Sequence, residues 1–204
     1  MIRPRPRLTL PGLVLLAAVL AGCGLAPDPA QPTATPLPGT VLNPPRVLAD
    51  FTLTDHTGAP FGLDDLRGRV ALVFFGFTHC PDICPTTLAD FKQVKTQLGS
   101  ATDEVAFVFV SVDGARDTPE RLAAYVRAFD PDFIGLTGDD AVLRPVAADF
   151  GVYYQAHAPA GGSGNYLVDH TASVFALDRE GRLAIVFPYG TPPDAIARRL
   201  RALL

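Results

Sequence analysis

Residues 70–88, VALVFFGFTHCPDICPTTL, determine the fold of this chain and place its central chemistry. The first eight residues form a continuous apolar run, which is typical of a strand buried on both faces. Cys80 and Cys84 follow, each succeeded by a proline, and apolar side chains then recur at helical spacing as far as Leu98. The stretch therefore predicts a buried strand, a tight turn and a helix, with both thiols at the turn.

Pro85 constrains how the two thiols are presented. Proline suits the first position of a helix and disfavours a helical conformation in the residue before it. We therefore expect Cys84 to cap the helix and Cys80 to lie in the preceding turn. The unpaired N–H groups at a helix start favour a thiolate. Asp82 lies between the cysteines, where it is a candidate auxiliary metal ligand.

The N-terminus has the features of a secretion signal. Three arginines precede an apolar stretch, residues 8–20, which is shorter than the ~20 residues that a membrane-spanning helix needs. Residues 20–23, LAGC, resemble a bacterial lipobox, which would make residues 1–22 a signal peptide and Cys23 the lipidated first residue of the mature chain. An ordinary signal peptide and an uncleaved anchor are the alternatives. All three place the protein outside the cytoplasm, and the lipobox predicts a lipoprotein anchored to the bacterial cell membrane.

Residues 23–45 are predicted to be the lipidated cysteine and a tether, because prolines alternate there with small residues and charge is almost absent. The folded domain is expected to span residues 46–204. The chain has 17 basic and 21 acidic residues, and removal of the three N-terminal arginines would change the net charge from −4 to −7. No basic stripe is present, which argues against a nucleic-acid partner.

The order of predicted elements indicates an α/β fold. Strand patterns alternate with helical ones, and a hairpin and a final helix close the chain. The predicted strands are residues 51–54, 60–63, 70–77, 105–112, 133–136, 152–155, 171–177 and 183–187, and the predicted helices follow Cys84, Thr118, Asp139 or Asp140, and Pro192. With cysteines where the first central strand meets its helix, this is the thioredoxin-like order, with helices on both faces of the sheet and an N-terminal strand pair.

The cysteine pair admits several chemistries. With Cys23 lipidated, Cys80 and Cys84 remain as an isolated pair in an oxidising compartment. A structural disulfide is the simplest alternative, but turn cysteines beside prolines are poorly placed to join distant segments. Peroxide reduction would need a threonine three residues before the reactive cysteine, where Phe77 and Pro81 stand. Thiol–disulfide exchange usually uses two intervening residues and here there are three, whereas metal binding needs at least one further ligand.

Four histidines are candidates for that ligand. His56 lies in a predicted surface turn, the side chain of His79 is expected to point away from Cys80, and His157 borders a Gly-rich loop at residues 158–165. His170 directly precedes a core strand, at the place where thioredoxins carry a cis-proline against the active cysteines. His170 is therefore the predicted third ligand, and Asp169 is a candidate to orient it.

Three motifs resemble the SCO/SenC family of copper chaperones for cytochrome c oxidase assembly. They are T-x-C-P-D-I-C-P-T at residues 78–86, S-V-D-x-x-R-D-T-P at 111–119 and D-H-T at 169–171. The resemblance covers residues 46–204. It departs from the family at residues 114 and 115, Gly-Ala, where the family often has Pro-Glu; this affects a loop.

The resemblance implies that Cys80, Cys84 and His170 bind copper, as Cu(I), Cu(II) or both. It further implies delivery of copper to the binuclear site of cytochrome c oxidase, with the copper-bearing oxidase subunit and other copper chaperones as partners. Such a protein is not a conventional enzyme. Two alternatives stay open: a thiol–disulfide oxidoreductase that reduces the recipient's cysteines, with Cys80 and Cys84 as the catalytic pair, and a copper or redox sensor.

Overall fold

An eight-stranded mixed sheet forms the centre of the protein, with strand order β1-β10-β9-β4-β5-β6-β2-β3. The computed structural model describes residues 38–157 and 166–204. Strands β4, β5 and β6 are parallel to one another, and every other pairing in the sheet is antiparallel. The strands are β1 (Thr40–Arg46), β2 (Thr52–Asp55), β3 (Pro60–Gly62), β4 (Val70–Gly76), β5 (Val105–Ser111), β6 (Ile134–Thr137), β9 (Val174–Leu177) and β10 (Leu183–Phe187).

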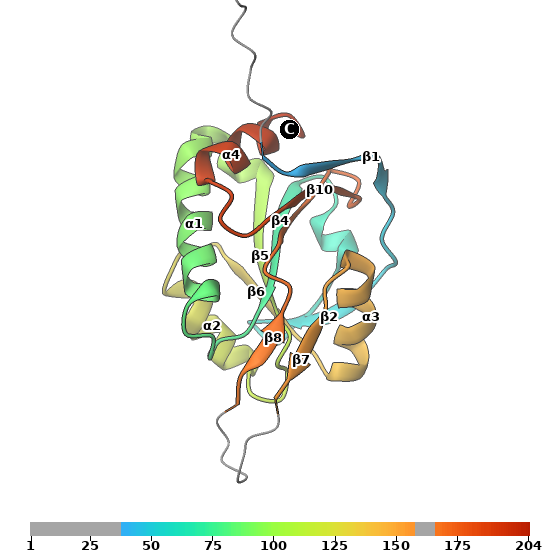
Figure 1. Cartoon of the computed structure of the whole chain (residues 1–204), viewed down its shortest axis with the longest axis vertical. Helices are drawn as coiled ribbons and strands as arrows, with labels where there is room; N and C mark the ends of the chain where they lie inside the picture. The colour runs from blue at the N-terminus through green and yellow to red at the C-terminus, as the bar shows by residue number, and fades with distance from the viewer. Residues whose placement is uncertain (1–37, 158–165) are drawn as a thin grey trace, which may run out of the picture. The chain divides into compact units, whose positions relative to one another are not determined.

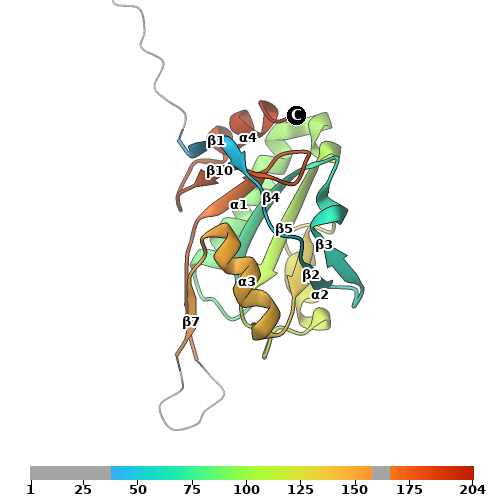
Figure 2. The same ribbon diagram turned by 90° about the vertical axis from the view of Figure 1, so that its right-hand side faces the viewer.

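Four α-helices cover the two faces of the sheet. They are α1 (Ile83–Leu98), α2 (Pro119–Arg127), α3 (Asp140–Phe150) and α4 (Pro193–Arg201), with short 3-10 helices η1 (Leu63–Leu66) and η2 (Gly99–Glu104) between strands. Figure 1 shows α1 and α4 on one side of the sheet and α3 on the other, and Figure 2 shows α3 lying in front of β4 and β5. This confirms the predicted thioredoxin-like arrangement, including the N-terminal strand pair β2–β3 and the C-terminal hairpin β9–β10.

Strand β4 is the axis of the core. All seven of its residues are buried, as are all seven of β5, because β4 lies between β5 and β9 and is covered on both faces. Aromatic side chains from the two strands and their covering helices pack edge to face around it, such as Phe75 with Phe150 and Phe175. The rigid strand ends at Gly76, at the edge of the sheet where the cysteine turn begins.

Two parts of the strand arrangement differ from the prediction made from the sequence. Residues 40–45, assigned above to the tether, form most of β1 and pair with β10, so the boundary at residue 46 is too late. The prolines Pro44 and Pro45 are accommodated because β1 is an edge strand with an irregular register. Strands β7 (Tyr154–Ala156) and β8 (Val168–His170) pair only with each other, as a separate two-stranded sheet.

Some predictions concern other parts of the chain. The signal peptide, the lipidated Cys23, the tether up to residue 37 and the loop at residues 158–165 lie outside the described residues. Among the helices that the structure describes, none combines the length and the apolar character needed to cross a bilayer.

Candidate metal centre

The cysteine turn leaves the end of β4 and enters α1 within a few residues. Helix α1 begins at Ile83 with Asp82 as its N-cap, so the prediction that Cys84 caps the helix is wrong. Cys84 instead lies in the first helical turn, and its backbone N–H donates to the Cys80 sulfur at 3.4 Å. Pro85 is tolerated one residue later, because the first four N–H groups of a helix have no partner within the helix. Both cysteines are free thiols.

Gly76 provides the space that the Cys84 sulfur occupies. A methyl group at this position would lie 2.7 Å from Cys84 Sγ and 2.8 Å from the ring of Phe109. Cys84 is completely buried, whereas Cys80 is half-buried at the rim. The absence of a side chain at the end of β4 therefore allows the first turn of α1 to place one sulfur directly against the strand.

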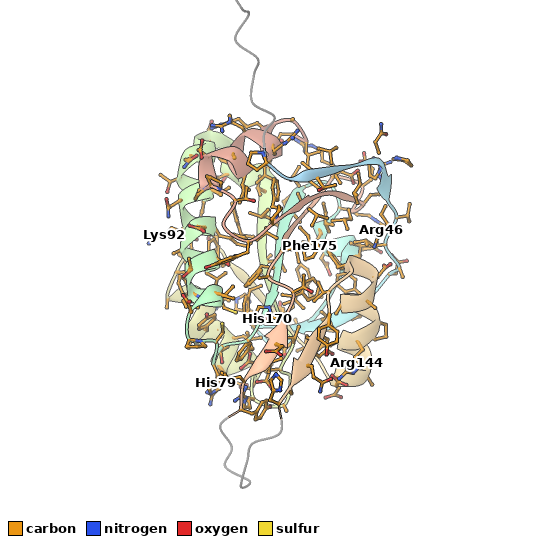
Figure 3. The ribbon with its side chains drawn as sticks, viewed as in Figure 1. Arg46, His79, Lys92, Arg144, His170 and Phe175 are labelled. Carbon is orange, nitrogen blue, oxygen red and sulfur yellow. The ribbon has the colours of Figure 1, made fainter. Side chains whose placement is uncertain are left out.

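His170 reaches this turn from β8, 86 residues away in sequence. Its Nε2 lies 3.5 Å from Cys84 Sγ, and its Nδ1 lies 3.2 Å from the carbonyl oxygen of Thr171. A carbonyl only accepts, so this contact requires the proton on Nδ1 and leaves the Nε2 lone pair facing the sulfur. The rings of Phe74 and Phe77 pack edge-on against the imidazole, each at 5.8 Å between centroids. In Figure 3, His170 lies where the β7–β8 hairpin meets the end of the sheet.

The three predicted ligands therefore converge. One donor atom from each of Cys80, Cys84 and His170 lies within 4.8 Å of the others. Two sulfurs and an imidazole nitrogen are soft or borderline donors, a set that suits copper or zinc and disfavours calcium or magnesium. Three protein donors also leave room in the coordination sphere for a ligand from another molecule.

The two thiols differ in acidity. The hydrogen bond from the Cys84 thiol stabilises the Cys80 thiolate and is the largest cause that lowers the pKa of Cys80, to about 5. The same hydrogen bond raises the pKa of Cys84, and burial of its sulfur adds to the effect. In the metal-free reduced protein at neutral pH, Cys80 is thus the thiolate and Cys84 the thiol that donates to it. A soft metal ion would replace that shared proton.

The auxiliary residues behave differently from the three donors. Asp82 is exposed in the turn, and its carboxylate is not part of the donor cluster. Asp169 was expected to orient His170, but its carboxylate contacts His157 Nε2 at 2.7 Å. Successive residues of a strand point to opposite sides, so Asp169 faces away from the imidazole that follows it. The carbonyl of Thr171 takes the orienting role instead.

The histidines that were set aside have other partners. His56 Nδ1 accepts from the backbone N–H of Gly135. His79 lies beside Arg121, with 3.0 Å between Nε2 and the guanidinium, and points away from the cysteine pair as expected. His157 is exposed on the hairpin.

A buried carboxylate that sequence reasoning did not single out supports the turn. Asp117 is fully buried and accepts from the N–H and the hydroxyl of Thr78, at 2.8 and 2.6 Å, and from the hydroxyl of Ser111 at 2.6 Å. It thereby fixes the segment that leads into Cys80. The available signal was its place in the second motif, six residues after Ser111 at the end of β5.

Asp117 also belongs to a second group of donors with His79 and Asp113, whose atoms lie within 4.8 Å of one another. The carboxylates in this group are already engaged by neighbouring hydrogen-bond donors, including Arg116 on Asp113. We therefore interpret this group as a hydrogen-bond network that supports the turn.

Known proteins resemble this chain over the whole folded region. The SCO1/SenC family model matches residues 40–204. A SCO2-like protein of Rickettsia felis is 35% identical over 156 residues, which are 76% of each chain. Bradyrhizobium japonicum ScoI, solved with copper bound, is 38% identical with a TM-score of 0.71, and the match covers 78% of this chain and 99% of that one. Apo Sco1 of Thermus thermophilus is 41% identical with a TM-score of 0.75, covering 84% and 99%. The range matched by the family model spans Cys80, Cys84 and His170.

Proposed function

This chain belongs to the SCO1/SenC family, and on that premise we propose that it is a copper chaperone whose cargo is held by Cys80, Cys84 and His170. The observation that carries the proposal is the convergence of two sulfurs and one imidazole nitrogen within 4.8 Å, at the end of a rigid buried strand. The ScoI structure with copper bound, 38% identical to this chain, supports the choice of copper.

The donor set suits a carrier that handles both oxidation states of copper. Two thiolates retain Cu(I), and the imidazole adds the nitrogen donor that Cu(II) favours. Because Cys80 is half-buried, an ion held by its sulfur would be within reach of solvent. A ligand of the recipient can enter there and take the ion as the chaperone's own ligands leave.

We further propose that the recipient is the copper-bearing subunit of cytochrome c oxidase and that other copper chaperones load the site. In this proposal residues 1–22 are removed as a signal peptide and Cys23 carries a lipid in the bacterial cell membrane. The proline-rich tether predicted after Cys23 would then link the folded domain to the membrane that holds the recipient.

The asymmetric acidity of the thiols favours a second candidate function, thiol–disulfide exchange. The Cys80 thiolate would attack a disulfide of the recipient, forming a mixed disulfide and releasing one recipient thiolate. Cys84 would then lose its proton and attack the Cys80 sulfur, releasing the second recipient thiolate and leaving a Cys80–Cys84 disulfide. Such a reaction would prepare the recipient's cysteines for copper, so the two functions are compatible at one site.

Copper titration of the reduced domain tests the proposal. We expect one copper ion per chain in either oxidation state. His170→Ala should lose tight Cu(II) binding and keep Cu(I) binding and dithiol exchange. His157→Ala, a change of the same kind on the same hairpin, should behave as the wild type. If reduced wild-type protein binds copper in neither state, the chaperone function is wrong. If a His170→Ala strain assembles the oxidase normally, delivery does not depend on this ligand.

A further inference from the structure

The β7–β8 hairpin carries His170 and is not hydrogen-bonded into the eight-stranded sheet. Its own pairing sets Tyr154 opposite His170 and Ala156 opposite Val168. In Figures 1 and 2 the hairpin extends from the end of the molecule, away from α4. The Phe74 and Phe77 rings hold the imidazole itself, and side chains that join the hairpin to the body of the domain add to this in fixing the position of His170.

The first such attachment is formed by Tyr166, Asp113 and Arg116. The Tyr166 hydroxyl donates to the Asp113 carboxylate at 2.6 Å, and Arg116 Nε donates to the same carboxylate at 2.5 Å. The Arg116 guanidinium lies 3.5 Å from the centre of the Tyr166 ring and donates to the Tyr166 carbonyl at 2.9 Å. Asp113 is buried, so these contacts are shielded from solvent. We call this set the inner clamp.

A second attachment repeats the same residue types on the other strand of the hairpin. The Tyr154 hydroxyl donates to the Asp140 carboxylate at 2.8 Å, and Arg144 pairs with that carboxylate at 2.6 Å. The Arg144 guanidinium lies 4.9 Å from the centre of the Tyr154 ring. This outer clamp joins the hairpin to the first turn of α3, and Figure 3 shows Arg144 on that helix beside the hairpin. Its charged side chains are more than half exposed.

We propose that the two tyrosine–aspartate–arginine clamps are positioning devices that hold the imidazole of His170 at the cysteine pair. Tyr166 and Tyr154 are the residues on the hairpin, and Asp113 with Arg116 and Asp140 with Arg144 are their anchors on the body. The copper readout of this inference rests on the proposed function, whereas the placement of the imidazole can be measured without metal.

The inner clamp has the larger effect, for two reasons. A hydrogen bond to a buried carboxylate is worth more than one at an exposed ion pair. The segment that carries Asp113 and Arg116 also carries Asp117, which holds Thr78 just before Cys80. One short segment after β5 therefore contacts both the strand that carries the imidazole and the turn that carries the half-buried thiol of Cys80.

Tyrosine-to-phenylalanine variants test the clamps, because each removes a single hydroxyl and keeps the ring. The test variants are Tyr166→Phe and Tyr154→Phe. The matched control is Tyr153→Phe, at a residue that directly precedes β7 and is 66% exposed. We expect the Cu(II) dissociation constant to rise about tenfold in Tyr166→Phe, about threefold in Tyr154→Phe and not at all in the control. Cu(I) binding should change by less than about twofold, since the two thiolates alone retain it.

A metal-free measurement separates this inference from the copper function. In the NMR spectrum of the reduced apoprotein, cross-peaks between the rings of His170 and Phe77 should weaken in Tyr166→Phe and persist in the control. If Tyr166→Phe matches the control in Cu(II) affinity and in these cross-peaks, or if Cu(I) and Cu(II) affinities fall equally, the positioning role is refuted. If the wild type binds no copper, the proposed function fails, and the cross-peaks alone decide the role of the clamps.

Discussion

Gly76→Ala tests the close fit between β4 and the cysteine-bearing turn. The new methyl carbon would lie 2.7 Å from Cys84 Sγ and 2.8 Å from a Phe109 ring carbon, well inside ordinary contact distances of ~3.5–4.0 Å. All of these atoms are buried, so α1 or the Phe109 ring must move. Gly76 has no positive φ, so alanine can adopt its backbone conformation.

The expected magnitude follows from two opposing terms. Overpacking in a filled core costs about 1–3 kcal/mol. The reduced freedom of alanine in the unfolded chain offsets about 0.4–1 kcal/mol of this. A net loss of about 1–2 kcal/mol corresponds to a decrease in Tm of about 2–8 °C for a domain of this size. Displacement of Cys84 should also weaken copper binding by about tenfold or more.

The assay is thermal unfolding of the reduced apoprotein, with a copper titration on the same samples. Gly135→Ala on β6 is the control, because the nearest atoms to its methyl group would be side-chain carbons away from the cysteine turn: Leu122 Cβ at 3.2 Å, Val126 Cγ1 at 3.3 Å and His56 Cβ at 3.5 Å. We expect this control to keep wild-type copper affinity. The cost of Gly76→Ala should shrink in a Cys84→Ala background, where the sulfur is gone. An unchanged cost in that background, to within about 0.5 kcal/mol, would refute the reasoning.

Three further predictions concern the thiols and the support of the turn. Because the pKa of Cys80 is lowered, the Cys80 thiolate is favoured at neutral pH. The rate of alkylation of Cys80 by iodoacetamide should therefore rise with pH, with a midpoint near 5 and a plateau above it, and Cys84 should not react. A midpoint near 9 would contradict the thiolate assignment. Asp117→Asn replaces an acceptor of three hydrogen bonds and should lower the free energy of unfolding, measured in urea titrations, by about 2–4 kcal/mol. A loss below about 0.5 kcal/mol, as expected for a substitution at an exposed site, would show that this network contributes little to stability. Thr118→Ala removes the side-chain cap that accepts from the Arg121 N–H, and differential scanning calorimetry should show a Tm lower by about 2–4 °C, with no change in copper binding.

The parts of the fold that the sequence predicted are those with strong local patterns. Strands β4 and β5 are continuous apolar runs, and α1 ends at Leu98 as its periodicity indicated. Thr118 caps α2, with Pro119 at its first position, also as predicted. Each of these features is decided by neighbouring residues, so a single sequence contains the necessary information.

The features that the sequence did not predict depend on distant partners. Strand β1 contains two prolines, and its backbone is extended by antiparallel pairing with β10, which lies far away in the sequence. The three-residue strands β7 and β8 are too short to show a period, and nothing local indicates that they pair apart from the main sheet. Long-range pairing of this kind is set by the whole fold.

The predictions for the candidate site were likewise correct in some parts and wrong in others. The meeting of Cys80, Cys84 and His170 was predicted because the cysteines follow the first central strand and His170 takes the place where thioredoxins carry a cis-proline. The role given to Asp169 was wrong because adjacency in a strand puts side chains on opposite sides. Asp117 was missed as a supporting residue because its partner Thr78 lies 39 residues earlier.

The unequal burial of the two sulfurs would give the proposed transfer of copper an order. Cys84 packs against Gly76 and has no exposed surface, whereas Cys80 is half-buried. A molecule that arrives from solvent meets Cys80 first and reaches Cys84 last. Loading should therefore finish at the buried sulfur, and unloading should begin at the rim, so that the ion keeps at least one protein ligand until the recipient has bound it.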